Sequence, residues 1–184
     1  INGTLTRGFN FWGNSGGLYS NIDINNVTGS TLAAATCLWI MDSIPFFQDV
    51  ELNRCDNGVW VRQFDDNIRT NAVIKDTIIK NSRFYGVIID KNDHTNYTNY
   101  VMATFENLEV SGTGGINSNG YEFQEGVAAI EVNTSGAIFE NINIHDNPVP
   151  GIIGYLVDDS LFMKDVQVKN CGKDNTYGHD SGIY

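Results

Sequence analysis

The stretch Phe139-Glu140-Asn141-Ile142-Asn143-Ile144 alternates apolar and polar residues on either side of Asn141, and five other stretches of the chain resemble it. The six align without gaps, with successive offsets of 28, 27, 31, 34 and 24 residues. Self-similarity at such a period is typical of solenoids, in which each repeat is one supersecondary unit. The repeats are YSNIDINNV from Tyr19, FQDVELNRC from Phe47, IKDTIIKNS from Ile74, FENLEVSGT from Phe105, FENINIHDN from Phe139 and MKDVQVKNC from Met163.

One column of this repeat contains only Asn or Asp, and the alternating columns around it predict strands with one buried face. Asn and Asp tolerate left-handed backbone and bond their own main chain across turns. The column therefore predicts a sharp corner between two short strands in every repeat. We call it the corner column; it consists of Asn21, Asp49, Asp76, Asn107, Asn141 and Asp165.

A glycine followed by apolar residues comes after five of the six repeats and predicts a third strand. Three strands in about 30 residues indicate a three-sided coil, so we expect residues 1–184 to form one all-β domain, a single-stranded parallel β-helix of six to seven coils. The first repeat offers Cys37-Leu38-Trp39-Ile40-Met41 instead of a glycine. The glycine-led segments are Gly58-Val59-Trp60-Val61, Gly86-Val87-Ile88-Ile89, Gly126-Val127-Ala128-Ala129, Gly151-Ile152-Ile153-Gly154 and Gly182-Ile183-Tyr184.

The corner column looks like the asparagine ladder of the pectin-lyase-like right-handed parallel β-helix superfamily, and the glycine-led strand is also similar. The resemblance covers the chain from Leu18 onward and implies a right-handed coil. It implies no particular activity, because that superfamily includes pectate lyases, polygalacturonases, alginate epimerases, phage tailspikes, adhesins and surface proteins.

The formal net charge of −11 argues against nucleic acid as a partner, since Lys and Arg are needed to neutralise phosphate. No apolar run reaches the ~18 residues of a membrane span, so membrane insertion is not expected. The start Ile1-Asn2-Gly3-Thr4 has neither an initiator Met nor a leader, which favours a mature product or a fragment of a longer solenoid. An extracellular, cell-surface or virion-surface location fits the acidic charge, which keeps such a surface soluble.

The cysteines and sequons carry weaker signals. Cys37, Cys55 and Cys171 are too few and odd in number for a disulfide scaffold, and we interpret them as small buried hydrophobes. Four sequons permit N-glycosylation, but the Ser and Thr content of the chain would produce a similar number by chance, so their presence does not demonstrate it. These sequons begin at Asn2, Asn26, Asn96 and Asn133.

No catalytic residue can be assigned from motifs. Polygalacturonase-like enzymes resemble one another in Asn-Thr-Asp, Asp-Asp, Gly-His-Gly and Arg-Ile-Lys signatures, and the first and last are missing here. The chain has Asp65-Asp66, Asp158-Asp159 and Gly178-His179-Asp180. Paired carboxylates suit acid and base work on a glycosidic bond, but these pairs follow the third strand, where Asp is equally expected for turn formation.

No cofactor or metal site is predicted either, although one loop leaves calcium open. Asp90-Lys91-Asn92-Asp93-His94 offers oxygen ligands without the spacing of a calcium loop, so a solvated polar insertion is the alternative. The histidines His94, His145 and His179 are scattered and have no metal-ligand spacing.

The third strand is apolar on both faces, so something must cover its outer side. Either the chain's own loops do so, or the strip is a contact for a partner. The strip is Trp60, Ile88, Ala128 and Ile153, with Arg62, Asp90 and Tyr155 at its rim and Tyr184 at the end of the chain.

These patterns favour an extracellular structural or adhesive module of a fibre, spike or surface assembly, non-catalytic and self-associating. GIY followed by INGTLT resembles GIIGYLVDD within the chain, which is expected either of a fragment cut from a longer solenoid or of copies that stack end to end. A glycan is a further candidate partner. The alternative is a polysaccharide lyase, glycoside hydrolase or epimerase, with Trp60, Tyr121 and Tyr155 along the sugar path.

Overall fold

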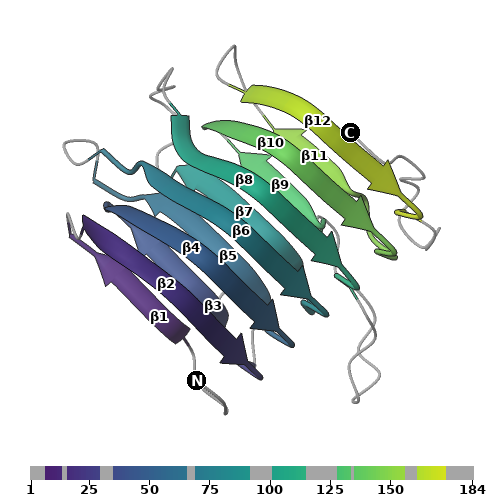
Figure 1. Cartoon of the computed structure of the whole chain (residues 1–184), viewed down its shortest axis with the longest axis horizontal. Coiled ribbons are helices and arrows are strands. Elements are labelled where there is room, and N and C mark those ends of the chain that lie inside the picture. Colours follow the sequence, from purple (N-terminus) through teal and green to yellow (C-terminus); the bar gives the residue numbers. More distant parts are fainter. Residues whose placement is uncertain are drawn as a thin grey trace.

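The structure is a computed structural model and describes residues 7–13, 16–29, 35–65, 69–91, 101–114, 128–133, 135–155 and 161–172. Within these ranges every regular element is a β-strand, and Figure 1 shows the strands stacked side by side along the molecule. They form two six-stranded sheets in which all neighbours are parallel.

The chain alternates between the two sheets, so each strand of one sheet serves as the crossover that a parallel pair in the other requires. The odd sheet contains β1 (Arg7–Trp12), β3 (Thr36–Met41), β5 (Asn57–Gln63), β7 (Tyr85–Lys91), β9 (Ile130–Asn133) and β11 (Ile152–Tyr155). The even sheet contains β2 (Gly16–Asn25), β4 (Ile44–Asn53), β6 (Ala72–Lys80), β8 (Val101–Ser111), β10 (Gly136–His145) and β12 (Leu161–Lys169). The result is an all-β, solenoid-like arrangement.

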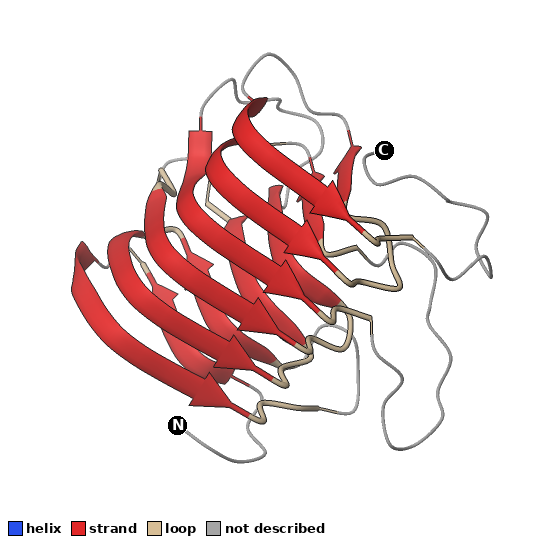
Figure 2. Cartoon of the chain, turned by 45° about the vertical axis from the view of Figure 1, so that its right-hand side comes forward, coloured by secondary structure: helices blue, strands red, loops and turns tan. Residues whose placement is uncertain are grey.

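The corner column lies within the strands of the even sheet. All six residues have left-handed backbone, with φ between 50° and 57°. Pairing resumes directly after each of them, as Ser20 pairs with Gln48 and Ile22 with Val50 on either side of the corner. The two short strands expected from the sequence are therefore one bent strand in each repeat, and Figure 2 shows this curvature.

A second left-handed column, not anticipated from the sequence, follows five residues after the first. Its φ values run from 52° to 66°. The pattern is hard to recognise because one member is arginine and another is glycine. Side chains also bond between neighbouring coils here, as Asn170 Nδ2 donates to Asp146 Oδ1 at 2.9 Å. The column consists of Asn26, Arg54, Asn81, Gly112, Asp146 and Asn170.

The core lies between the sheets and is filled by three inward columns of the even sheet together with the inner residues of the odd sheet. Phe105 and Phe139 occupy one of these columns, with ring centroids 5.4 Å apart and nearly parallel planes. In the four central strands of the even sheet, β4, β6, β8 and β10, these columns are buried. The central members are Phe47, Ile74, Phe105, Phe139; Val50, Thr77, Leu108, Ile142; and Leu52, Ile79, Val110, Ile144.

The glycines that begin two odd strands are required by close approach between coils. A Cβ atom on Gly58 would collide with the carbonyl oxygen of Gly86 and would lie 2.6 Å from Cγ2 of Ile79. On Gly86 it would lie 2.6 Å from the carbonyl oxygen of Ala129. The glycine-led pattern therefore marks positions where backbone packs against backbone.

The interpretation of the cysteines was wrong in part. Cys37 and Cys55 are buried, as expected of small hydrophobes, but they form a disulfide with Cα atoms 5.8 Å apart. Cys171 is free and partly buried. An odd cysteine count does not exclude one bond, and only the stacking of coils brings Cys37 at the start of β3 beside Cys55 before β5.

Removing this disulfide is expected to lower the free energy of unfolding by about 3 kcal/mol, the loop-closure value for its 18-residue separation. The comparison is urea unfolding of the Cys37→Ser/Cys55→Ser double variant against the parent chain. Cys171→Ser, which leaves the bond intact, is the control and is expected to shift stability by less than about 1 kcal/mol. Equal stability of the double variant and the control would contradict a formed disulfide.

Candidate functional site

The outer face of the odd sheet carries all three tryptophans of the chain, on three strands that are neighbours in the sheet. Leu38 and Val59 point into the core, so the alternation of strand residues places Trp39 and Trp60 on the opposite side. Trp39 pairs with Trp60, and Trp60 pairs with Ile88. We call this surface the tryptophan face; it consists of Trp12, Trp39, Trp60, Arg62, Phe64, Asp90 and Glu131.

Two of the tryptophans lie against each other, with their rings tilted by 37°, and each contacts an arginine. The ring centroids of Trp39 and Trp60 are 4.7 Å apart. The guanidinium carbon of Arg7 lies 3.9 Å from the centroid of Trp39, and that of Arg62 lies 5.8 Å from Trp60. Arginine over an aromatic ring is attracted by the ring quadrupole, so these contacts hold both rings in place.

Asp90 connects the next two strands of the face. Its Oδ1 atom accepts the indole N–H of Trp60 at 2.8 Å and lies 3.7 Å from Nε of Arg62. A carboxylate that accepts from an indole and faces a guanidinium fixes the orientation of both partners. The positions of Trp60 and Arg62 are therefore set before any ligand arrives.

Side chains at the edges of the tryptophan face are exposed to solvent, and those at its centre are buried or partly buried. Trp12 is 60% exposed and Phe64 is 56% exposed, whereas Trp39 is buried and Trp60 is partly exposed. The indole nitrogen of Trp39 is buried and has no hydrogen-bond acceptor among the described residues. Exposed aromatic side chains beside charged groups are characteristic of interaction sites.

The register of β9 corrects the predicted strip. Ile88 pairs with Glu131, and Glu131 pairs with Ile153, so the position expected for Ala128 belongs to Glu131. Ala128 precedes β9 and is buried. The glycine-led pattern predicts the outward position at Ala128, three residues before Glu131, which occupies it. The alternation Ile130-Glu131-Val132-Asn133 is nevertheless a clear strand signal. The outer row therefore contains a carboxylate and is not apolar throughout.

Burial raises the pKa of the Glu131 carboxyl to about 7. A hydrogen bond from Tyr85 opposes this increase, and the negative charge of Asp90 adds to it. A carboxyl group with this pKa exchanges its proton near neutral pH, which is the property required of a general acid or base.

The remaining residues of the predicted strip fall in the expected rows. Trp60, Ile88 and Ile153 share one row, and Arg62 pairs with Asp90 in the next. Ile88 is 6% exposed and Ile153 is 2% exposed, so little of their surface is open to another molecule. Tyr155 pairs with Asn133 through the backbone at the end of this second row. Tyr121 and Tyr184 lie outside the described residues.

Other predicted positions are only partly covered by the structure. Asp65 lies in the turn after β5, where its backbone N–H donates to Asp42 Oδ1 at 3.1 Å. Asn26 lies in the second left-handed column and Asn133 ends β9, both partly buried. In the calcium-candidate loop only Asp90 and the buried Lys91 are described. The positions outside the described residues are Asn2, Asp66, Asn92, Asp93, His94, Asn96, Asp158, Asp159, Gly178, His179 and Asp180.

The described ranges contain neither a group of metal ligands nor a membrane-spanning helix. No three of their His, Cys, Asp or Glu side chains are grouped so that they could hold a metal ion. No helix in those ranges has the length and apolarity needed to cross a membrane.

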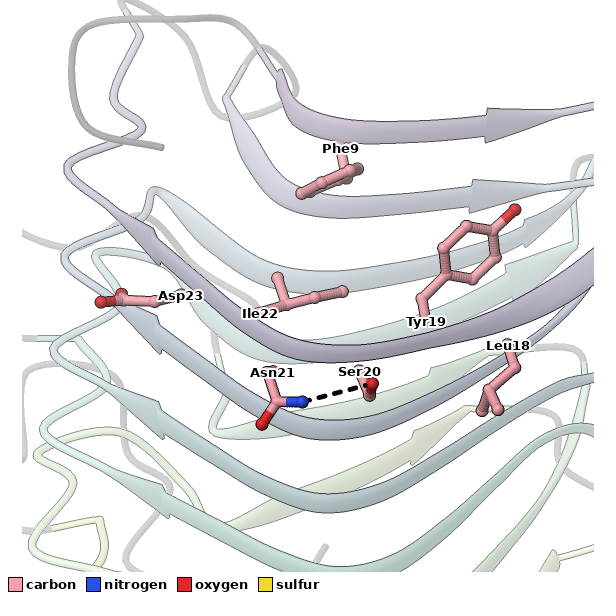
Figure 3. A pocket seen from close by; sticks show the side chains of 7 residues that line it. All are labelled: Phe9, Leu18, Tyr19, Ser20, Asn21, Ile22 and Asp23. Atoms are coloured by element: carbon pink, nitrogen blue, oxygen red, sulfur yellow. Dashed lines mark hydrogen bonds between the residues drawn. The ribbon is translucent and has the colours of Figure 1, made fainter.

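A second candidate surface lies at the two ends of the stack. The inward columns, buried in the central coils, become partly exposed at Tyr19 and Ile22 in β2 and at Met163, Val166 and Val168 in β12. A pocket of about 490 Å³ lies at the β2 end, and Figure 3 shows the side chains that line it. Phe9 comes from β1 and the others from β2: Leu18, Tyr19, Ser20, Asn21, Ile22 and Asp23.

The side chains of each surface suit it to a particular kind of binding or chemistry. The tryptophan face combines aromatic rings, the guanidinium group of Arg62, that of Arg7 over Trp39, and two carboxyl groups. The ends offer apolar side chains beside strand edges. No protein family, no curated protein and no solved structure matches this chain.

Proposed function

We propose that this chain is an extracellular structural or adhesive module of a fibre, spike or surface assembly, folded as a single-stranded right-handed parallel β-helix, and that it self-associates end to end without catalysing a reaction. The right hand follows from the general rule for parallel crossovers, which are right-handed in about 98% of cases. The alternation of the chain between two parallel sheets supports the helical path.

The observation that carries this proposal is the change in burial along the inward columns. Phe47, Phe105 and Phe139 are fully buried, while Tyr19 and Met163 in the same column are partly exposed. In the described part of the chain, β2 and β12 each have a pairing partner on one side only. A further layer at each end would bury these side chains and pair the edges.

A second copy of the chain matches this requirement closely. The left-handed residues of β2 and of β12 have the same spacing, Asn21 with Asn26 and Asp165 with Asn170. Stacking β2 of one copy on β12 of another therefore continues the bends that already pair β10 with β12. In that register Met163 would pack on Tyr19, and Val168 on Ile24.

The charges along these two strands are also complementary. Lys164 and Lys169 are exposed on β12, and Asp23 is exposed on β2. The continued register would place Lys169 beside Asn25 and one diagonal step from Asp23. Attraction of this kind steers the partners and selects the register more than it strengthens binding.

The disulfide supports an extracellular location. Disulfides persist in oxidising compartments and are rare where glutathione keeps thiols reduced. The Cys37–Cys55 bond, together with the net charge of −11, fits a protein that acts outside the reducing cytosol.

Self-association is tested by sedimentation velocity and electron microscopy over a wide concentration range. The parent chain is expected to form rods that lengthen with concentration. Met163→Lys, which puts a charge on the end layer, is expected to stop growth, whereas Phe162→Lys on the outward side of β12 is expected to leave it intact. Circular dichroism checks that both variants fold. Isolated monomers of the parent chain at the highest concentration would overturn the proposal.

A second candidate function, action on an extracellular polysaccharide as a lyase, hydrolase or epimerase, is favoured by one observation. Burial raises the pKa of Glu131 to about 7, and Asp90 lies two register positions away on the neighbouring strand, so the face holds an acid and a base candidate. The test is a polysaccharide screen for new reducing ends, unsaturated products or changed sugar configuration. Glu131→Gln and Asp90→Asn should abolish turnover, and Asp65→Ala should not. No product from any polysaccharide would exclude this candidate.

A further inference from the structure

We propose that the tryptophan face binds a neutral glycan, with sugar rings packed on Trp12 and Trp60 and with sugar hydroxyls bonded to Arg62, Asp90 and Glu131. This goes beyond end-to-end assembly, because it assigns a ligand to the outer face of the odd sheet. The two proposals can fail separately.

The first argument is the concentration of aromatic residues on one surface. All three tryptophans of the chain lie on this face, and Phe64 lies two residues beyond Arg62. Trp12 and Phe64 are each more than half exposed, although such side chains are normally covered. An exposed flat ring offers the apolar surface on which the C–H face of a pyranose ring packs.

The second argument is the set of polar groups between the rings. Asp90 accepts from Trp60 with one oxygen, and Arg62 lies beside both. Carboxylate oxygens accept from sugar hydroxyls, and a guanidinium donates to them in a fixed fork. Because Arg62 is already held between Trp60 and Asp90, binding a ligand would order few additional side chains.

The spacing of the rings indicates an oligosaccharide and not a single sugar. β3 lies between β1 and β5, so Trp12 and Trp60 are two strands apart and two residues out of step. Standard strand spacing and rise give about 12 Å between their Cα atoms. A ligand that contacts both rings must therefore contain more than one pyranose unit.

The charges indicate a neutral glycan. The chain has a net charge of −11. On the face, the carboxyl groups of Asp90 and Glu131 offset the guanidinium groups of Arg7 and Arg62, so no excess of positive charge is left to bind an acidic sugar. A polymer of uronic acids would be repelled by the net charge of the chain, whereas a neutral sugar would not.

The experiment is a fluorescence titration of the full chain with cellohexaose, xylohexaose, mannohexaose and maltohexaose, and with hexagalacturonate as the acidic comparison. Because every tryptophan lies on this face, fluorescence excited at the long-wavelength edge of tryptophan absorption, where the eight tyrosines do not absorb, reports on it. We expect a saturable change with at least one neutral hexasaccharide. Trp12→Ala should weaken it about tenfold, the equivalent of about 1.4 kcal/mol.

The control is Phe162→Ala, which removes an aromatic side chain of similar exposure, 51%, from the even sheet and should leave binding unchanged. The Met163→Lys variant should bind as the parent chain does, whether or not the chain forms rods. Absence of saturable binding by all four neutral sugars, equal or tighter binding of hexagalacturonate, or equal losses in Trp12→Ala and Phe162→Ala would each overturn the inference. A fluorescence change with protein concentration alone, and none with sugar, would instead assign the face to a second copy.

Discussion

Replacing Phe105 with alanine is expected to lower the free energy of unfolding by about 3–5 kcal/mol, as for other buried phenylalanines. Phe105 is fully buried in β8 and stacks on Phe139 of the next coil. β8 is paired along its length with β6 on one side and β10 on the other. The backbone around the cavity is therefore held in two ladders and cannot collapse to fill it.

Urea unfolding followed by far-ultraviolet circular dichroism measures this loss. Phe162→Ala is the matched control, since Phe162 lies in β12 of the same sheet and is half exposed. The control is expected to shift stability by less than about 1 kcal/mol. Similar losses in both variants would mean that the inward column is not the core of the fold.

Replacing Glu131 with glutamine is expected to change how stability depends on pH. The pKa of this carboxyl is about 7 in the folded chain and 4.5 ordinarily, so between these values the folded state binds the extra proton. The free energy of unfolding of the parent chain therefore falls as pH rises from about 4.5 to about 7, by about 3.5 kcal/mol from this group. Glutamine cannot ionise, so the variant lacks this fall.

The measurement is the stability difference between Glu131→Gln and the parent chain at several pH values. The variant should gain about 3.5 kcal/mol relative to the parent between pH 4 and pH 8, and no more above that. The buried Asp56, whose pKa is also raised mainly by burial, is present in both chains and cancels in the difference. Asn133→Ala, on the same strand and face, changes no ionisable group and should give a difference that is flat with pH. A flat difference for Glu131→Gln would place that carboxyl in solvent.

The two proposed surfaces would act together in an assembly. Each copy added to an end-to-end rod would add one tryptophan face, so the rod would present the same face many times. Linked sites of this kind can exceed the affinity of one site by 10²–10⁴ without a new contact, provided that the ligand spans them. Weak binding of a neutral glycan by one copy would then suffice for adhesion by the rod.

The parts of the fold that depend on local backbone chemistry were predictable. The corner column was visible because Asn and Asp tolerate left-handed backbone, and Asn21 and Asp165 adopt it together with the four between them. The second column was missed because Arg54 and Gly112 interrupt it: arginine gives no turn signal, and glycine fits many conformations. In such positions the stacked neighbours impose the bend.

Less of the candidate site was predictable. The alternation of Trp60 and Arg62 with apolar residues indicates that their side chains point away from the core, as they do, but β1 precedes the first repeat, so the repeat carries no information about Trp12. Glu131 was not predicted because the glycine-led segment that begins at Gly126 indicates a strand just before the alternating residues 130–133. The disulfide required the three-dimensional proximity of two residues 18 apart.

The amino-acid sequence by itself determined the repeat, the buried columns and the left-handed corners, because each depends on a residue's own conformational preference or on a period of two. The tertiary structure alone decided which residues meet across coils: Trp39 with Trp60, Ile88 with Glu131, and Cys37 with Cys55. The physical reason is that the coils differ in length. A shift in register between two coils changes every contact on the outer face but leaves each coil's own pattern unchanged.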